Sequence, residues 1–115
     1  MAEITLTSFT PIGDGAVALW ETLTCGDTGE WIELKDFNNN TVTVSGTFNS
    51  QTLTMQGANA PDKTDAFTLT DNNGVNIALT AAGGVLVAEA PRYVRPSFSG
   101  STGGDVDVYL QLRNG

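Results

Sequence analysis

The sequence predicts an all-β protein, folded as a single antiparallel β-sandwich domain that could take the jelly-roll form. Polar and apolar residues alternate with a period of two through several segments, which is the pattern of half-buried strands. Clusters rich in Gly, Asn and Asp separate these segments at the spacing of short strands. No segment carries a sustained helical repeat, so the chain is expected to bury the inner faces of two sheets against each other.

The first half of the chain predicts four strands. Residues 1–16 are expected to form an N-terminal arm or first strand, and residues 17–115 the sandwich domain. Apolar residues flanked by turn signals indicate the early strands, and strict alternation of Val with Thr or Ser indicates the fourth. These four strands are expected at Ile4–Phe9, Val17–Thr24, Glu30–Leu34 and Thr41–Phe48, with turns at Gly13–Gly15, Gly26–Gly29 and Asn38–Asn40.

The second half continues the pattern. Asn49–Gln51 is expected to connect the fourth strand to an alternating segment around Leu53 and Met55, and 58–65 is expected to be an exposed loop. The clearest alternation is the last one, in which Val106, Val108, Leu110 and Leu112 share one face. The expected strands are Ala66–Leu69, Val75–Thr80, Val85–Glu89, Tyr93–Phe98 and Asp105–Arg113, with turns at Asp71–Gly74, Gly83–Gly84 and Gly103–Gly104.

Charge and composition exclude several classes of function. The 115 residues include 13 acidic and 5 basic ones and no histidine, which gives a net charge of -8. Binding to nucleic acid or to an anionic membrane surface requires clustered Lys and Arg, so neither partner is expected. Residues 1–9 have no signal-peptide pattern, and we expect synthesis in a cytoplasm. The single cysteine cannot form an internal disulfide.

The sequence provides no catalytic set, cofactor motif or metal site. Cys25 has no histidine to activate it and is flanked by acidic residues, which favours an unreactive cysteine at a strand end. Asp71–Gly74 resembles part of a calcium loop, but a turn explains it better because the terminal bidentate Glu is missing. Asp105 and Asp107 share one face of the last strand, where a charged, solvated sheet edge is the favoured interpretation. We therefore expect a protein that is not an enzyme.

Five residues are candidates for an interface: Trp20, Trp31, Arg92, Tyr93 and Arg95. Trp20 has the opposite parity to Val17 and Leu19, so it is expected to leave the core face. Both tryptophans could fill the core, meet a subunit or stack on a sugar, and the first two are favoured.

The other three candidates lie in one stiff segment. Pro91 and Pro96 bound the hexapeptide that contains them, and proline restricts the backbone at both ends. Tyr93 and Arg95 should share one face of an extended segment. Arg95 is expected to pair with a carboxylate, either in its own fold or across a subunit boundary.

Several segments resemble small virion proteins of tailed double-stranded DNA bacteriophages. The resemblance runs from about Trp20 to the C-terminus, and 58–62 departs from the expected turn. It rests on Gly26–Glu30, Thr41–Phe48, Leu53–Gly57, Leu69–Asp71 with Gly74, and Glu89–Pro96 followed by a Gly-rich turn and a final strand.

The resemblance implies a capsid decoration, or cement, protein on the outer surface of the virion. Such a protein would bind the major capsid protein, stabilise contacts between capsomers and assemble as a homotrimer. The alternative is a carbohydrate- or receptor-binding module of a head fibre or tail, with Trp20, Trp31 or Tyr93 as stacking surfaces.

Overall fold

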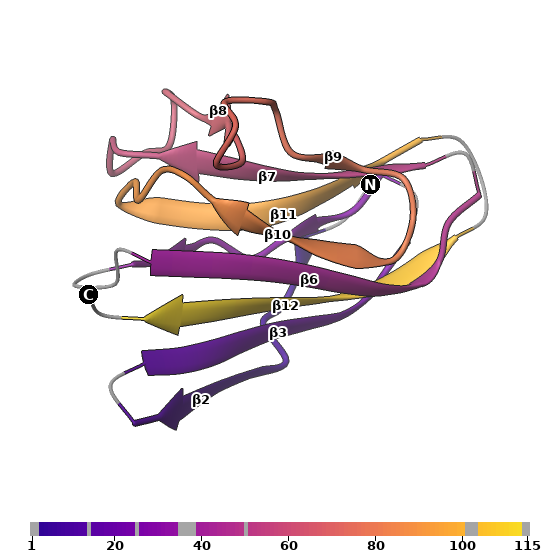
Figure 1. Cartoon of the computed structure of the whole chain (residues 1–115), viewed down its shortest axis with the longest axis horizontal. Helices are drawn as coiled ribbons and strands as arrows, with labels where there is room; N and C mark the ends of the chain where they lie inside the picture. The colour runs from indigo at the N-terminus through magenta and orange to yellow at the C-terminus, as the bar shows by residue number, and fades with distance from the viewer. Residues whose placement is uncertain are drawn as a thin grey trace.

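The computed structural model describes residues 3–13, 15–24, 26–34, 39–49, 51–100 and 104–113. In these residues the protein is all-β, and its strands form two sheets packed face to face (Figure 1). None of the described segments is a helix with the length and hydropathy needed to cross a membrane. The β-sandwich predicted from the sequence is confirmed.

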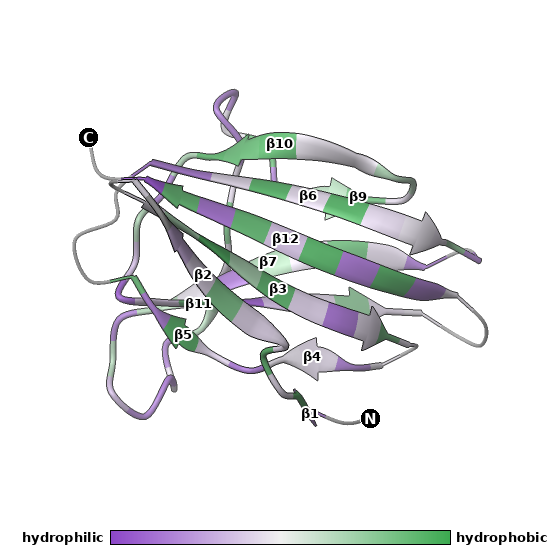
Figure 2. Cartoon of the chain, turned by 90° about the horizontal axis from the view of Figure 1, so that it is seen from below, coloured by the Kyte–Doolittle hydropathy of each residue, from purple (hydrophilic) through white to green (hydrophobic). Residues whose placement is uncertain are grey.

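The first sheet has five strands, and every neighbouring pair in it is antiparallel. Figure 2 shows this sheet from its outer side, with green and purple alternating along β12 as the period of two requires. Its order is β10 (Gly83–Val87), β6 (Asn39–Thr47), β12 (Asp105–Arg113), β3 (Gly15–Leu23) and β2 (Ser8–Ile12).

The second sheet is built around two long strands, β7 and β11, with short strands on either side. All of its pairs are antiparallel except that between β1 and β4. The main path runs β1 (Glu3–Ile4), β4 (Thr28–Gly29), β11 (Tyr93–Ser99), β7 (Thr52–Ala58) and β8 (Phe67–Thr68), while β5 (Ile32–Glu33) pairs with β11 and β9 (Ala78–Leu79) pairs with β7.

The order of the strands is that of a jelly roll. From β3 onward β4 and β5 act as one interrupted strand and β8 and β9 as another. Counted in this way, the chain changes sheet at every step except one, because β7 and the interrupted strand after it lie in the same sheet. This path places β12 between β3 and β6 in one sheet, and β11 between β4 and β7 in the other. Strands β1 and β2 extend the two sheets, and the jelly-roll form predicted from the alternation is thereby present.

The core lies between the sheets and follows the predicted alternation closely. On β12, Val106, Val108, Leu110 and Leu112 are all buried, while Asp105, Tyr109 and Gln111 on its outer face are exposed. The inward residues of β7 and β11, such as Leu53 and Phe98, pack against them in one cluster. Burial of these side chains is the main source of stability of the fold.

The predicted orientation of Trp20 is wrong. Trp20 is 0% exposed and belongs to the core, whereas Val17 and Leu19 lie on the outer face of β3 and are half-buried. The inward positions that precede it are Ala16 and Ala18, whose small side chains leave space for the indole in the close-packed interior. Trp20 is therefore not an interface residue of the folded chain.

The indole of Trp20 packs closely against the opposite sheet. Its Nε1 donates a hydrogen bond to the carbonyl oxygen of Glu30 at 3.1 Å, so its polar atom is satisfied in the core. A Cβ at Gly29 would lie 2.7 Å from Cδ1 of Trp20 and 2.6 Å from Cδ of Pro96. Glycine at this position of β4 allows the indole and the proline ring to pack together.

The predicted strand Glu30–Leu34 is shorter than expected, and Pro96 accounts for the difference. On this side of β11, pairing holds at Tyr93 and Val94 with β5 and resumes at Ser97 with β4. Pro96 lies between these pairs and has no N–H to donate to a ladder. The neighbouring strand is accordingly split into β4 and β5.

The N-terminal segment packs against the sandwich that follows it in the same chain. Its β1 pairs with β4 in one sheet and its β2 with β3 in the other. Between them, the N–H of Leu6 donates to Oε1 of Glu30 at 2.9 Å, and the N–H of Thr7 donates to the carbonyl of Leu19 at 2.7 Å. The predicted strand Ile4–Phe9 is thus two strands, one on each sheet.

Three further expectations need correction. Gly83–Gly84 is not a turn, because both residues pair within β10. Asn39 and Asn40 begin β6 instead of lying in a turn. Asp105 and Asp107 are not on a sheet edge, since β12 is a central strand; Oδ1 of Asp107 accepts a hydrogen bond from the N–H of Thr22 at 2.9 Å, beside the irregular pairing of β12 with β3.

Candidate interaction surface

The outer face of the β11 sheet gathers four of the five residues that the sequence singled out. Along β11, Val94, Pro96 and Phe98 are buried, while Tyr93 and Arg95 are half-buried on the opposite face, as predicted. Here cations contact aromatic rings. We call the group the cation–aromatic face; it consists of Trp31, Lys63, Arg92, Tyr93 and Arg95.

Arg95 is held by an indole and an amide. Its Cζ lies 4.5 Å from the ring centroid of Trp31, within the range of a cation–π interaction. Its Nε donates a hydrogen bond to Oε1 of Gln56 at 2.8 Å, and the two residues are direct partners across β11 and β7. The residue just before β5 and the middle of β7 therefore position this guanidinium.

The surroundings of Arg95 are partly dehydrated. Burial lowers the pKa of its guanidinium, and the negative charge of Glu3 opposes that effect. Among the described residues no carboxylate oxygen lies within 4.0 Å of a guanidinium nitrogen of Arg95. The ion pair that these residues do form joins Arg92 and Glu33. The described part of the fold therefore does not contain the carboxylate that was expected to pair with Arg95.

Tyr93 is contacted by two cations. The Nζ of Lys63 lies 4.4 Å from its ring centroid, and the Cζ of Arg92 lies 5.3 Å from it. Lys63 comes from the loop after β7, which the sequence predicted to be exposed. In this loop the carboxylate of Asp65 accepts hydrogen bonds from the N–H groups of Asn59 and Ala60, which gives the segment a defined shape.

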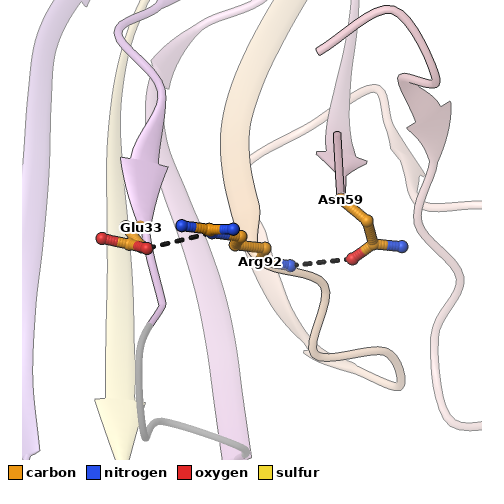
Figure 3. A network of polar contacts seen from close by, with 3 residues as sticks. All are labelled: Glu33, Asn59 and Arg92. Atoms are coloured by element: carbon orange, nitrogen blue, oxygen red, sulfur yellow. Dashed lines mark hydrogen bonds and ion pairs between the residues drawn. The ribbon is translucent and has the colours of Figure 1, made fainter. Parts of the chain in front are cut away.

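Arg92 links this loop to β5, as Figure 3 shows. Its Nε donates to Oε2 of Glu33 at 3.1 Å, and its backbone N–H donates to Oδ1 of Asn59 at 3.0 Å. The side chains of the ion pair are 54% and 39% exposed. A pair this exposed contributes little to stability, and its main effect is to orient the guanidinium beside Tyr93.

The sequence analysis missed one member of the face, Lys63, and the residue that holds Arg95, Gln56. Lys63 had no motif, and only its loop was predicted. Gln56 could have been found from the register, because a predicted β7–β11 pair would place an amide opposite Arg95.

The remaining candidates do not form a site in the described residues. Cys25 lies outside them. Asp71–Gly74 is a turn, in which Oδ1 of Asp71 accepts hydrogen bonds from the N–H groups of Asn73 and Val75 at 2.8 and 3.1 Å. Within the described ranges there is no group of three or more Cys, Asp or Glu side chains placed to hold a metal ion, and no pocket. The cation–aromatic face is a surface, not a cavity.

Comparison with known proteins shows the fold. No protein-family model matches the sequence, and no curated protein matches it. Among solved structures, the SPBc2 prophage-derived protein YomS is similar with a TM-score of 0.60 and 15% identity, covering 90% of this chain and 98% of YomS. At this identity the likeness establishes a shared fold with a prophage-derived protein.

Two weaker similarities are to bacterial proteins. A cupin domain from Bordetella pertussis has a TM-score of 0.48 and 13% identity, with 98% of each chain covered. IMPa from Pseudomonas aeruginosa, solved in complex with an O-glycopeptide, has a TM-score of 0.49 and 13% identity; the match covers 91% of this chain but only 13% of IMPa.

Proposed function

We propose that this chain is a non-enzymatic structural protein of a tailed bacteriophage particle, and specifically a capsid decoration protein. In this role it is made in the host cytoplasm and binds the major capsid protein on the outer surface of the head. Its attachment stabilises the contacts between neighbouring capsomers. Neither nucleic acid nor a membrane is its partner.

The observation that carries the proposal is the cation–aromatic face. Trp, Tyr and Arg are the residues most enriched at the energetic centres of protein interfaces, and here they share one outer sheet face. The fold shared with a prophage-derived protein and the sequence resemblance to virion proteins support the phage assignment. Binding to a lattice with many copies lets each contact be weak.

A carbohydrate-binding module is the second candidate, because Trp31 and Tyr93 are aromatic residues on one face. The geometry favours it less. Sugars stack on an open ring face, whereas Arg95 lies over the ring of Trp31, and Lys63 and Arg92 contact that of Tyr93. A sugar approaching those sides would have to displace a cation.

Co-sedimentation with undecorated phage heads tests the proposal. The protein should pellet with heads, and Trp31→Ala together with Arg95→Gln should reduce the pelleted fraction, while Arg113→Gln on the other sheet should not. Tryptophan fluorescence with added oligosaccharides tests the alternative. No pelleting, combined with a sugar-dependent fluorescence change, would favour the carbohydrate-binding module.

Two further properties belong to the same proposal. Attachment includes a Coulomb term, so stripping from heads should become easier as ionic strength rises. On the head the protein forms a homotrimer, since cyclic symmetry suits a lattice three-fold axis. Sedimentation equilibrium of the free protein and a map of decorated particles test the trimer; a monomer in both would contradict it.

A further inference from the structure

Two cations of the cation–aromatic face lack a close negative partner. Nε of Arg95 is bonded to an amide, while its Nη1 and Nη2 have no hydrogen-bond partner among the described residues. Lys63 contacts the ring of Tyr93, and in the described residues its Nζ is not within 4.0 Å of a carboxylate oxygen. Within 4.0 Å neither cation meets a carboxylate of a described residue, while Glu3 attracts Arg95 and Asp62 attracts Lys63 from a greater distance.

The acidic residues nearby are largely engaged within the chain. Glu33 is paired with Arg92. Asp62 accepts hydrogen bonds from the N–H and hydroxyl of Thr64, and Asp65 accepts them from the backbone of its own loop. Glu3 attracts Arg95 electrostatically without forming an ion pair. These contacts leave the terminal nitrogens of Arg95 available to an external acceptor.

We propose that the cation–aromatic face binds a carboxylate-rich segment of a partner protein, and that Arg95 pairs with one of its carboxylates. A guanidinium presents a planar fork of donors that matches a carboxylate with two parallel hydrogen bonds. The indole of Trp31 and the amide of Gln56 hold Arg95 in place, so little side-chain freedom is lost on binding. Arg95 is the anchor, and Lys63 adds attraction at short range.

This inference deepens the proposed function, because it names the chemistry that the partner must present to this face. The net charge of -8 does not prevent such binding. The Debye length is about 8 Å at physiological ionic strength, so repulsion from distant acids is screened while the contacts at the face are retained.

The chain is suited to a direct spectroscopic test. It has three arginines, at 92, 95 and 113, and two tryptophans, so the Nε–H and indole N–H signals in a proton–nitrogen NMR spectrum are few. The probe is a short oligoglutamate peptide at neutral pH, and an oligoglutamine peptide of equal length is its uncharged control. The signals of Arg95 and Trp31 should shift with oligoglutamate, while that of the buried Trp20 should stay in place.

Matched variants locate the binding. Arg95→Gln should weaken oligoglutamate binding about tenfold or more, as loss of a charge-assisted pair predicts. Arg95→Lys keeps the charge without the fork and should give an intermediate affinity. Arg113→Gln removes the same charge from the end of β12 and should change the affinity less than about twofold, well below a tenfold, 1.4 kcal/mol effect.

Several results would overturn the inference. Oligoglutamate could leave the Arg95 signal unmoved, or oligoglutamine could shift it equally. Equal weakening by Arg113→Gln would show a general charge effect. A stronger response to inorganic phosphate would identify a small-anion site, and a stronger response of Trp31 to a neutral oligosaccharide would identify a sugar site. Because the wild-type titration needs no variant to fold, and because head binding is measured separately, failure here leaves the proposed function standing.

Discussion

Replacing Trp20 by alanine should destabilise the protein far more than replacing Trp31. Trp20 is fully buried between the sheets, and its Nε1 is bonded to the carbonyl of Glu30. Trp31 is only half-buried on the outer face, where it contacts Arg95. The two substitutions are chemically identical, so the difference between them measures the effect of location.

The size of the effect follows from burial. Truncating a core tryptophan to alanine costs about 3–5 kcal/mol, because apolar burial is lost and a cavity remains. Unfolding entropy is about 2.1 cal/mol/K per residue, or about 0.24 kcal/mol/K for 115 residues. Trp20→Ala should therefore lower the Tm by about 12–21 °C. Trp31→Ala loses partial burial and a cation–π contact worth about 0.5–1 kcal/mol, so its Tm should fall by only about 4 °C.

Circular dichroism melts of the two variants and the parent provide the measurement. Trp20→Phe adds a finer step, since it retains an aromatic ring and removes the hydrogen bond to Glu30, which is worth about 1 kcal/mol. Similar Tm values for Trp20→Ala and Trp31→Ala would refute the assignment of Trp20 to the core. An emission maximum for Trp31→Ala at the wavelength of a solvated indole would refute it independently.

Three further predictions concern packing, pH and a buried amide. Gly29→Ala should cost about 1–3 kcal/mol, because its Cβ would overlap two packed rings, while Gly83→Ala, with open space around its Cβ, should be tolerated; paired thermal melts compare them. Hydrogen bonds from Thr64 hold the pKa of Asp62 below its ordinary value of 3.8, so their stabilising contribution is present above that value and lost as the pH falls through the lower folded pKa. An NMR titration should show this low midpoint and its return toward 3.8 in Thr64→Val; an unchanged midpoint would contradict the cause. Gln51 is 0% exposed and both its amide atoms lack a partner among the described residues, so the near-isosteric Gln51→Met should raise the Tm, and a lowered Tm would show that the amide is satisfied in solution.

The sequence predicts the sandwich well where one strand face is uniformly apolar. On β12 the four inward residues are all Val or Leu, and the observed bounds equal the predicted ones. The predicted inner face of β3 is wrong, because the inward positions before Trp20 are alanines while the outward ones are Val17 and Leu19. Hydrophobicity alone ranks the two faces in the wrong order, since a large indole needs small neighbours on its own face.

The candidate surface is only partly predictable for a different reason. The position of Tyr93 and Arg95 on the same face follows from strand periodicity within six residues. Contacts with Trp31 and Lys63 depend on which strands become neighbours, and local sequence does not contain that information. That Arg95 meets the amide of Gln56, and no carboxylate among the residues that the structure describes, depends in turn on the register of β7 and β11.

The central place of β12 affects how the protein is made. In its sheet, β3 and β6 do not pair with each other. Each pairs with β12, which is translated after both of them. Until the ribosome has released that strand, β3 and β6 each present an open edge of backbone N–H and C=O groups to other chains. The sheet can therefore close only after β12 has been translated. Folding should be slow, on the scale of about milliseconds to seconds typical of β-sandwiches, with its greatest exposure to aggregation just before β12 inserts.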